Sequence, residues 1–274
     1  MERTVETFFS LFMEELKQHA ALRSYHKVAN DEKKYLFRKA YLQQRFDYLI
    51  KNISGNQASI LDAGCGYGTS SLLLAFMGYK KVVGVTLEYY FNAIEQRLEY
   101  WKKYIDNPLP EFQYRNLLTN PFPAETFDYI IVQDTLHHLE PINKALSLLW
   151  EALTKEGTII VSEENGSCVF IRFRHFSERG FMRIKKIYDE QLGEYVLLGN
   201  ENTRSLRKWK KLFSEAGFSF NDDSVEYIRF YPPWYFNKQG MERILHKERN
   251  LSKKNSILRK YFFFGINFTA KKNT

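Results

Sequence analysis

The sequence has few cysteines and no long apolar run. Cys65 and Cys168 are the only two cysteines in 274 residues, which leaves no disulfide framework and no spacing typical of a metal site. We therefore expect a cytoplasmic location and predict no bound metal. No apolar run approaches the roughly 20 residues that a membrane-spanning helix needs. Charged residues interrupt the N-terminal apolar residues, so we also expect no signal peptide.

A segment with three alternating glycines, Ile60–Thr69, is the most informative part of the chain. The apolar residues at its start suit a buried strand, and the residues after it suit the first turns of a helix. A glycine turn at such a junction lets backbone N–H groups approach a ligand closely, with no Cβ in the way at Gly66 and Gly68. The pattern from Asp62 onward is Asp-x-Gly-x-Gly-x-Gly, and it indicates a nucleotide-type ligand without identifying it.

Further strand and helix patterns alternate after this turn. Strand-like segments lie at 82–87, 112–114, 127–132 and 157–162, and helix-like segments lie at 89–105 and 141–154. This alternation predicts a parallel sheet whose ligands bind at the carboxyl ends of the strands. Glu88 stands at the end of the second strand, where an acid can accept hydrogen bonds from two ribose hydroxyls.

The order and spacing of these motifs, with Phe127-Asp128 and His137-His138-Leu139, resemble the class I S-adenosylmethionine-dependent methyltransferases. The resemblance is to the small-molecule branch, of the UbiE/UbiG-like type, and covers roughly residues 40–230 and the last strand. It implies an α/β fold: a Rossmann-like seven-stranded, mostly parallel sheet with helices on both faces and an antiparallel last strand. It also implies S-adenosylmethionine as the cofactor and a small-molecule acceptor of the methyl group.

The resemblance also assigns a cofactor site within this chain. Its members are Asp62, Gly64, Cys65, Gly66, Glu88, Asn116, Leu117 and Gln133. Asn116 stands where the family usually has aspartate, and its amide oxygen can still accept a hydrogen bond from the adenine amino group. Each position has another explanation when taken singly: Asp62 could cap the turn, and Glu88 could be a solvated acid at a helix start. A nicotinamide-binding enzyme is the nearest rival, and the missing Gly-x-Gly-x-x-Gly argues against it.

The sequence is less informative about the methyl acceptor. A general base is needed when the acceptor arrives protonated. We predict that His137 is this base, because it follows the fourth strand and has a suitable pKa range, and that Glu163 contributes to catalysis at the end of the fifth strand. The alternatives are that the histidine pair is architectural and that the acid only bonds neighbouring backbone.

Four regions follow from these patterns. We predict an N-terminal helical cap at 1–50, the cofactor-binding half of the methyltransferase domain at 51–165, a substrate-side insertion at 166–200 and the C-terminal half at 201–274. The last region contains a basic excursion before the final strand. Residues 238–274 carry ten Lys or Arg and two acids, which equals the net charge of +8 of the whole chain.

The basic excursion raises the question of partners. Residues 238–260 could contact an anionic membrane peripherally, which would suit an amphiphilic or lipid-like acceptor, or could be an ordinary solvated surface. Nucleic acid is an unlikely partner, because no recognition module is evident. A non-catalytic cofactor-binding module and methylation of nucleic acid remain the alternative functions.

Overall fold

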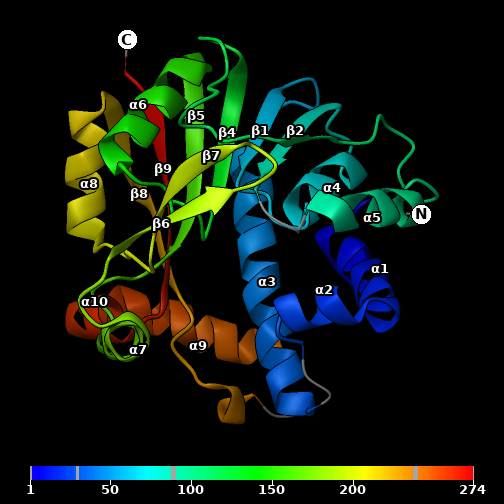
Figure 1. Cartoon of the computed structure of the whole chain (residues 1–274). Coiled ribbons are helices and arrows are strands. Elements are labelled where there is room, and N and C mark those ends of the chain that lie inside the picture. Colours follow the sequence, from blue (N-terminus) through cyan, green and yellow to red (C-terminus); the bar gives the residue numbers. More distant parts are fainter. Residues whose placement is uncertain (1, 29–30, 88–90, 237–239, 274) are drawn as a thin grey trace.

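A computed structural model describes residues 2–28, 31–87, 91–236 and 240–273. A seven-stranded sheet lies at the centre of the fold (Figure 1). Its strands are β1 (Ser59–Ala63), β2 (Lys81–Thr86), β3 (Glu111–Tyr114), β4 (Phe127–Gln133), β5 (Leu153–Glu164), β8 (Phe218–Ile228) and β9 (Gly265–Lys272). They lie in the order β3-β2-β1-β4-β5-β9-β8. Strands β1 to β5 pair in parallel, and β9 lies antiparallel between β5 and β8. The predicted Rossmann-like sheet with a reversed last strand is confirmed.

Helices cover both faces of the sheet. They are α1 (Val5–Gln18), α2 (Ala20–Tyr25), α3 (Glu32–Asn52), α4 (Thr69–Phe76), α5 (Ile94–Trp101), α6 (Ile142–Ala152), α7 (Val169–Arg179), α8 (Leu206–Glu215), α9 (Met241–Lys254) and α10 (Ser256–Phe262). Alternate residues of each strand point to opposite faces. Leu61 therefore packs in the cluster that contains α6 and α8, whereas its neighbour Ile60 packs in the cluster that contains α3 and α4.

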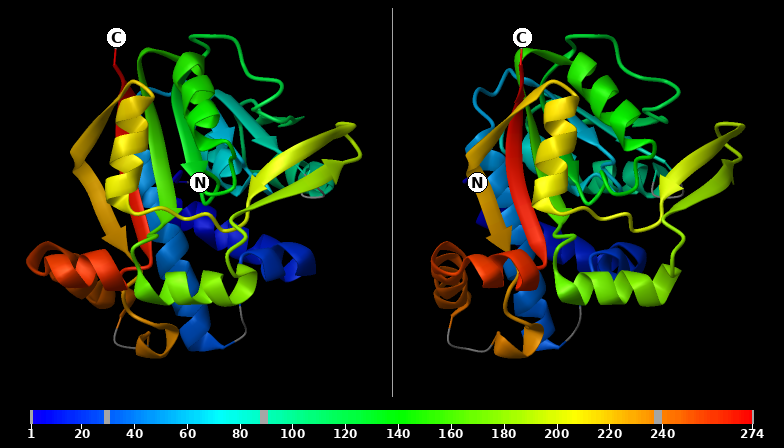
Figure 2. Two further views of the ribbon diagram at one scale, coloured as in Figure 1. Left: turned by 60° about the vertical axis from the view of Figure 1, so that its left-hand side comes forward. Right: turned by 90° about the vertical axis from the view of Figure 1, so that its left-hand side faces the viewer.

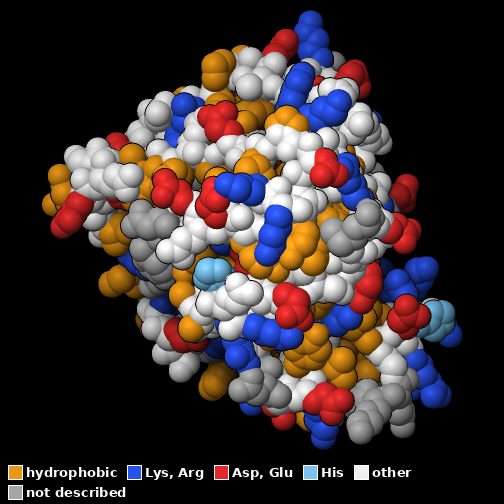
Figure 3. Space-filling model, turned by 90° about the vertical axis from the view of Figure 1, so that its right-hand side faces the viewer, with side chains coloured by type: hydrophobic (Ala, Val, Ile, Leu, Met, Phe, Trp, Pro, Cys, Tyr) orange, Lys and Arg blue, Asp and Glu red, His pale blue; other side chains and the backbone are white. Residues whose placement is uncertain are grey.

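The N-terminal helices are fastened to the glycine turn by buried charges. Glu15 of α1 forms a two-pronged ion pair with Arg97 of α5, at 2.8 and 2.7 Å, and both side chains are almost fully buried. Arg97 also donates to the carbonyl of Tyr67 and to the hydroxyl of Thr69, which belong to the turn and to the start of α4. On the outer face that α1 and α5 form, side chains of both signs are interspersed (Figure 3).

Residues 166–200 lie outside the main sheet. They form α7 and a separate hairpin of β6 (Ile184–Asp189) and β7 (Glu194–Gly199), which projects away from the sheet (Figure 2). The tip of the hairpin reaches the end of β3, where Tyr114 donates to Asp189 at 2.7 Å and Asn116 donates to Glu194 at 2.7 Å.

The basic excursion uses its apolar side for packing. Ile244 of α9 is buried, and Met241 and Leu245 pack beside it against residues of α3. The carboxylate of Glu248, also on α9, accepts from the backbone N–H groups of Arg229 and Phe230. Ile244, Met241 and Leu245 of the basic excursion therefore pack against the protein itself. None of the described helices is long and apolar enough to cross a membrane.

Candidate active site

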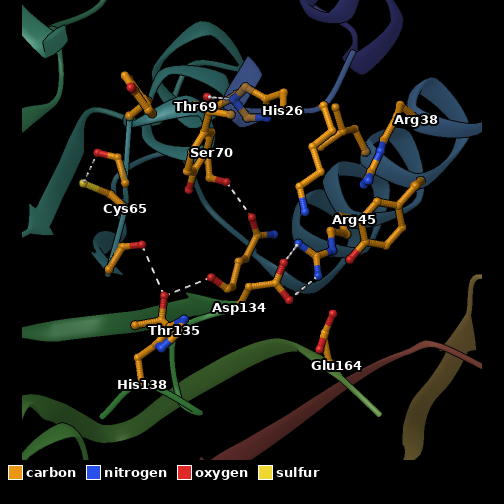
Figure 4. Close-up of a pocket in the computed structure, with 18 of the residues that line it drawn as sticks. His26, Arg38, Arg45, Cys65, Thr69, Ser70, Asp134, Thr135, His138 and Glu164 are labelled. Carbon is orange, nitrogen blue, oxygen red and sulfur yellow. Dashed lines mark hydrogen bonds and ion pairs between the residues drawn. The ribbon is translucent and has the colours of Figure 1, made fainter. Parts of the chain in front are cut away.

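A cavity of about 880 Å³ opens at the carboxyl ends of β1, β4 and β5 (Figure 4). This is the edge at which ligands bind in open parallel sheets, and the volume suits a cofactor together with a small acceptor. The glycine turn and α4 form one side of the cavity. Helices α2 and α3 form a second side. The segment after β4 and the loop between β7 and α8, which we call the Glu201 loop, form a third.

The glycine turn requires glycine for two reasons. Gly64, Gly66 and Gly68 all have φ between +53° and +78°, the left-handed region that other residues rarely adopt. A Cβ on Gly64 would lie 2.3 Å from the Thr135 side chain, and a Cβ on Gly66 would lie 2.6 Å from the Tyr25 hydroxyl. The turn thus forms a cradle that a side chain would fill.

Asp62 and Cys65 lie beside this cradle in poorly solvated positions. Burial raises the pKa of Asp62 to about 6, although a hydrogen bond from Ser71 at 2.7 Å opposes the shift. The carboxylate is therefore ionised at neutral pH and has few partners of its own, which suits a site for an ammonium group. Burial likewise raises the pKa of the Cys65 thiol well above its usual value, so it stays protonated and is a poor nucleophile.

Gln133, at the end of β4, has one satisfied and one unsatisfied side-chain atom. Its amide oxygen accepts from the Ser70 hydroxyl at 2.7 Å, while its buried amide nitrogen has no hydrogen-bond partner among the described residues. An orphaned buried donor on a cavity wall indicates a missing ligand atom, because such a group is costly to leave unpaired.

Asn116 and Leu117, two further predicted cofactor residues, do not line the cavity. Asn116 is buried, and its side chain donates to Glu194 and accepts from the N–H of Leu118. Leu117 packs against the apolar core. Glu88 lies outside the described residues. The roles of these three residues therefore stay predictions.

The predicted catalytic pair forms one unit. The Nδ1 atom of His137 lies 2.5 Å from the carboxylate of Glu163, whose other oxygen accepts from the backbone N–H groups of Thr135 and Leu136. Burial alone would lower the pKa of His137, but the negative charge of Glu163 outweighs it and raises the pKa to about 9. Glu163 is buried behind the ring, so only His137 of this pair reaches the cavity.

An ion pair crosses the cavity next to this unit. Arg45 of α3 donates two hydrogen bonds, of 2.6 and 2.7 Å, to the carboxylate of Asp134, which directly follows β4 (Figure 4). Burial would raise the pKa of Asp134, but the Arg45 guanidinium holds it below its ordinary value. Asp134 has φ of +47°, and the cavity-lining residues Lys27, Glu201 and Arg229 are also non-glycine residues in this region. Such backbone strain concentrates at functional sites.

Comparisons with known proteins agree with this geometry. Residues 61–161 match the model of a family described as a methyltransferase domain. No curated protein matches the chain. Residues 61–161 are therefore similar to a methyltransferase domain, the class of protein that the sequence motifs predicted.

Solved structures share the fold at low sequence identity. A putative S-adenosylmethionine-dependent methyltransferase from Listeria monocytogenes is 16% identical with a TM-score of 0.56, over 86% of this chain and 99% of that one. A putative sarcosine dimethylglycine methyltransferase from Galdieria sulphuraria is 14% identical, also at 0.56, over 84% and 86%. The [4+2]-cyclase SpnF is 15% identical, again at 0.56, over 84% and 80%. At these identities the likeness concerns the fold alone.

Sequence reasoning did not identify several residues of the cavity. Arg38, Arg45 and Arg229 come from segments that carry no motif, and Glu201 follows the insertion. Tyr25, whose pKa burial raises to about 12, covers the glycine turn from α2. No local pattern marks these positions, since their importance arises only when α2, α3 and the Glu201 loop meet the sheet.

Proposed function

We propose that this protein transfers a methyl group from S-adenosylmethionine to a small-molecule acceptor that carries an anionic group. Asp62, Gly64, Gly66 and the free amide nitrogen of Gln133 suit the cofactor, because they combine a negative charge, a cradle without Cβ atoms and an unsatisfied donor. When bound there, S-adenosylmethionine would supply an electrophilic methyl group, and its sulfur would keep the electron pair of the carbon–sulfur bond. The protein must then orient the acceptor in line with that bond.

The observation that supports an anionic acceptor is a pair of arginines on the cavity wall. Arg38 of α3 and Arg229, just after β8, both line the cavity, and neither forms an ion pair with a carboxylate within the described ranges. Burial and then the charge of Arg229 lower the pKa of Arg38. Two cations held close together in a poorly solvated site favour a bound carboxylate or phosphate.

In this proposal Glu163 is a positioning residue and His137 is the member of the pair that meets the acceptor. A small anionic acceptor is favoured over nucleic acid, because the two arginines lie on the wall of a cavity rather than on an extended surface. The predicted amphiphilic acceptor and membrane contact through 238–260 gain no support from the packing of α9.

The proposal is tested in two stages with the full chain. Calorimetric titration with S-adenosylmethionine, with its demethylated product and with NAD as the control should give binding of the first two only. Methyl transfer is then measured on a panel of small hydroxy- and amino-carboxylates, each beside its carboxamide. We expect turnover on carboxylates, and a loss of roughly tenfold to a hundredfold in kcat/KM in Arg229→Met, the range for a lost hydrogen bond to a charged group.

Arg172→Met is the matched control, because Arg172 lies on the exposed side of α7 and does not line this cavity. It should change neither binding nor turnover. Equal turnover on carboxylates and carboxamides would contradict the anionic acceptor. A folded protein that binds neither sulfur nucleotide would contradict the proposed reaction.

A further inference from the structure

Three potential metal ligands converge at the acceptor end of the cavity. A nitrogen of His137, a nitrogen of His138 and a carboxylate oxygen of Glu201 all lie within 4.8 Å of one another. The Nε2 of His137 is 3.7 Å from the Glu201 carboxylate. Ligand atoms at the usual 2.0–2.1 Å from a tetrahedral ion would lie roughly 3.4 Å apart, so small side-chain rotations would complete such a site.

Each of the two imidazole rings is held by a hydrogen bond at its Nδ1 atom. The Nδ1 of His137 contacts the carboxylate of Glu163 at 2.5 Å, and the Nδ1 of His138 contacts the backbone carbonyl of Gly199 at 2.9 Å. Both partners are hydrogen-bond acceptors, so each Nδ1 carries the hydrogen. The Nε2 atoms are then the ligating atoms, and histidines that bind metals almost always have such a second contact.

Glu201 is brought to these histidines by a close approach of two backbones. A Cβ on Gly199 would lie 1.9 Å from the carbonyl oxygen of His137, and the Gly199 N–H donates to the carbonyl of His138 at 2.8 Å. Two residues later, Glu201 has φ of +52°, a strained value for a glutamate. The end of the β6–β7 hairpin is thus clamped to the segment after β4, with Glu201 directed at the rings.

Glu201 forms no ion pair with an arginine or lysine of the described residues. Among the described residues its ion pairs are with His137 and with His175, at 3.3 Å. A second group, Glu164, His175 and Glu201, also has ligand spacing, but the Arg174 guanidinium already donates to Glu164 at 2.8 Å. The first group has no such contact with an arginine among the described residues and is therefore the better candidate.

We propose that His137, His138 and Glu201 bind one divalent first-row transition-metal ion of the Zn²⁺ type. Two imidazoles and one carboxylate suit such an ion and leave coordination positions open toward the cavity. The binding itself is independent of the proposed function. What rests on that function is the acceptor class, a hydroxyl compound whose oxygen binds the ion. Its O–H bond then breaks, the proton passes to water, and the electron pair stays on the oxygen.

The experiment is a titration of the untagged full chain with Co²⁺, after removal of bound metal by a chelator. Visible absorption of protein-bound Co²⁺ and competition by Zn²⁺ should report one bound equivalent. Glu201→Gln and His138→Ala should each weaken binding at least roughly tenfold, and Glu163→Gln by roughly 10–100-fold, as for a residue that orients a ligand. Glu178→Gln is the matched control, because Glu178 lines the same cavity outside the group, and it should bind as the unmodified chain does.

Each remaining outcome has a definite meaning. Absence of Co²⁺ binding, or equal affinity in Glu201→Gln, would overturn the proposal. Tighter binding in Arg174→Met would move the ion to the second group and overturn this assignment as well. Circular dichroism and calorimetry with S-adenosylmethionine check that the variants fold. Metal binding without methylation of any hydroxyl compound would count against the proposed function alone, whereas methylation that resists the chelator would count against the metal.

Discussion

The two halves of the cavity are built in different ways. The cofactor half is formed by the ends of β1 and β4 and by one continuous turn, and its acid, Asp62, is buried with a raised pKa. The acceptor half combines the segment after β4 with α3, α7 and the β6–β7 hairpin. Two of its acids, Asp134 and Glu164, pair with arginines, and the pKa of Glu164 is lowered because the His175 hydrogen bond and the Arg174 charge outweigh the opposing effect of burial.

The halves also differ in how their surroundings are packed. Every residue of α4, next to the glycine turn, is buried. In contrast, Phe173 of α7 is 76% exposed and Phe181, before the hairpin, is 89% exposed. The cofactor half is therefore part of the core, while α7 and the segment before the hairpin expose large apolar side chains in the acceptor half. This difference teaches that one fold can keep its cofactor site while its acceptor site changes.

The largest expected effect tests whether the cofactor half depends on the N-terminal helices. Glu15→Ala leaves the buried Arg97 without its counter-charge, which we expect to lower the free energy of unfolding by about 3–5 kcal/mol. Urea unfolding measures this. Glu14→Ala is the control on the same helix, because its carboxylate is exposed, and it should change stability by less than about 0.5 kcal/mol. Equal effects would mean that the buried pair does not fasten the turn.

A second expected effect is on the pH dependence of stability, and it tests the contrast between Asp62 in the cofactor half and the ion-paired acids in the acceptor half. The pKa of Asp62 is raised to about 6 in the folded state, so the folded protein binds this proton more tightly than the unfolded chain. Its contribution to stability is therefore present below about pH 4 and is lost as the pH rises through 6, by at most about 3 kcal/mol. Urea unfolding between pH 4 and 8 should show this fall relative to Asp62→Asn. A constant difference between the two proteins would contradict the shift.

The smallest expected effect is a loss of ligand affinity, and it tests whether the two halves of the cavity bind their ligands independently. Gly66→Ala should weaken S-adenosylmethionine binding roughly tenfold or more, since a left-handed alanine costs about 1–2 kcal/mol and its Cβ meets Tyr25. Co²⁺ binding should be unchanged. Gly199→Ala should do the reverse, because it pushes the Glu201 loop away from His137.

Gly55→Ala is the control for both glycine variants, because Gly55 has φ of +78° but a methyl group there would meet nothing within 4 Å among the described residues. It should lower stability without changing either affinity. If Gly66→Ala and Gly199→Ala each reduced both affinities, the two halves would behave as one site, and the comparison would fail.

Much of the cofactor half could be predicted from the sequence. Asp62, Gly64, Cys65, Gly66 and Gln133 were all expected at a ligand site, and all five line the cavity. Asp62 to Gly66 lie at the end of β1 and in the turn after it, and Gln133 ends β4, so strand and turn patterns are enough to bring them to one edge of the sheet. The acceptor half was harder, because residues as far apart as Arg45, Asp134 and Glu201 meet only after the sheet has formed.

The sequence by itself determined the alternating strands and helices between residues 60 and 162 and the glycine turn, because periodicity and backbone freedom are local properties, while the reversed last strand was expected from the resemblance to a family. Only the tertiary structure decided that Glu15 neutralises Arg97, that Glu163 stands behind His137, and that Gly199 brings Glu201 to the histidines. The physical reason is distance along the chain. Charge pairing and close backbone approach depend on which segments the fold places side by side, and no local pattern encodes that.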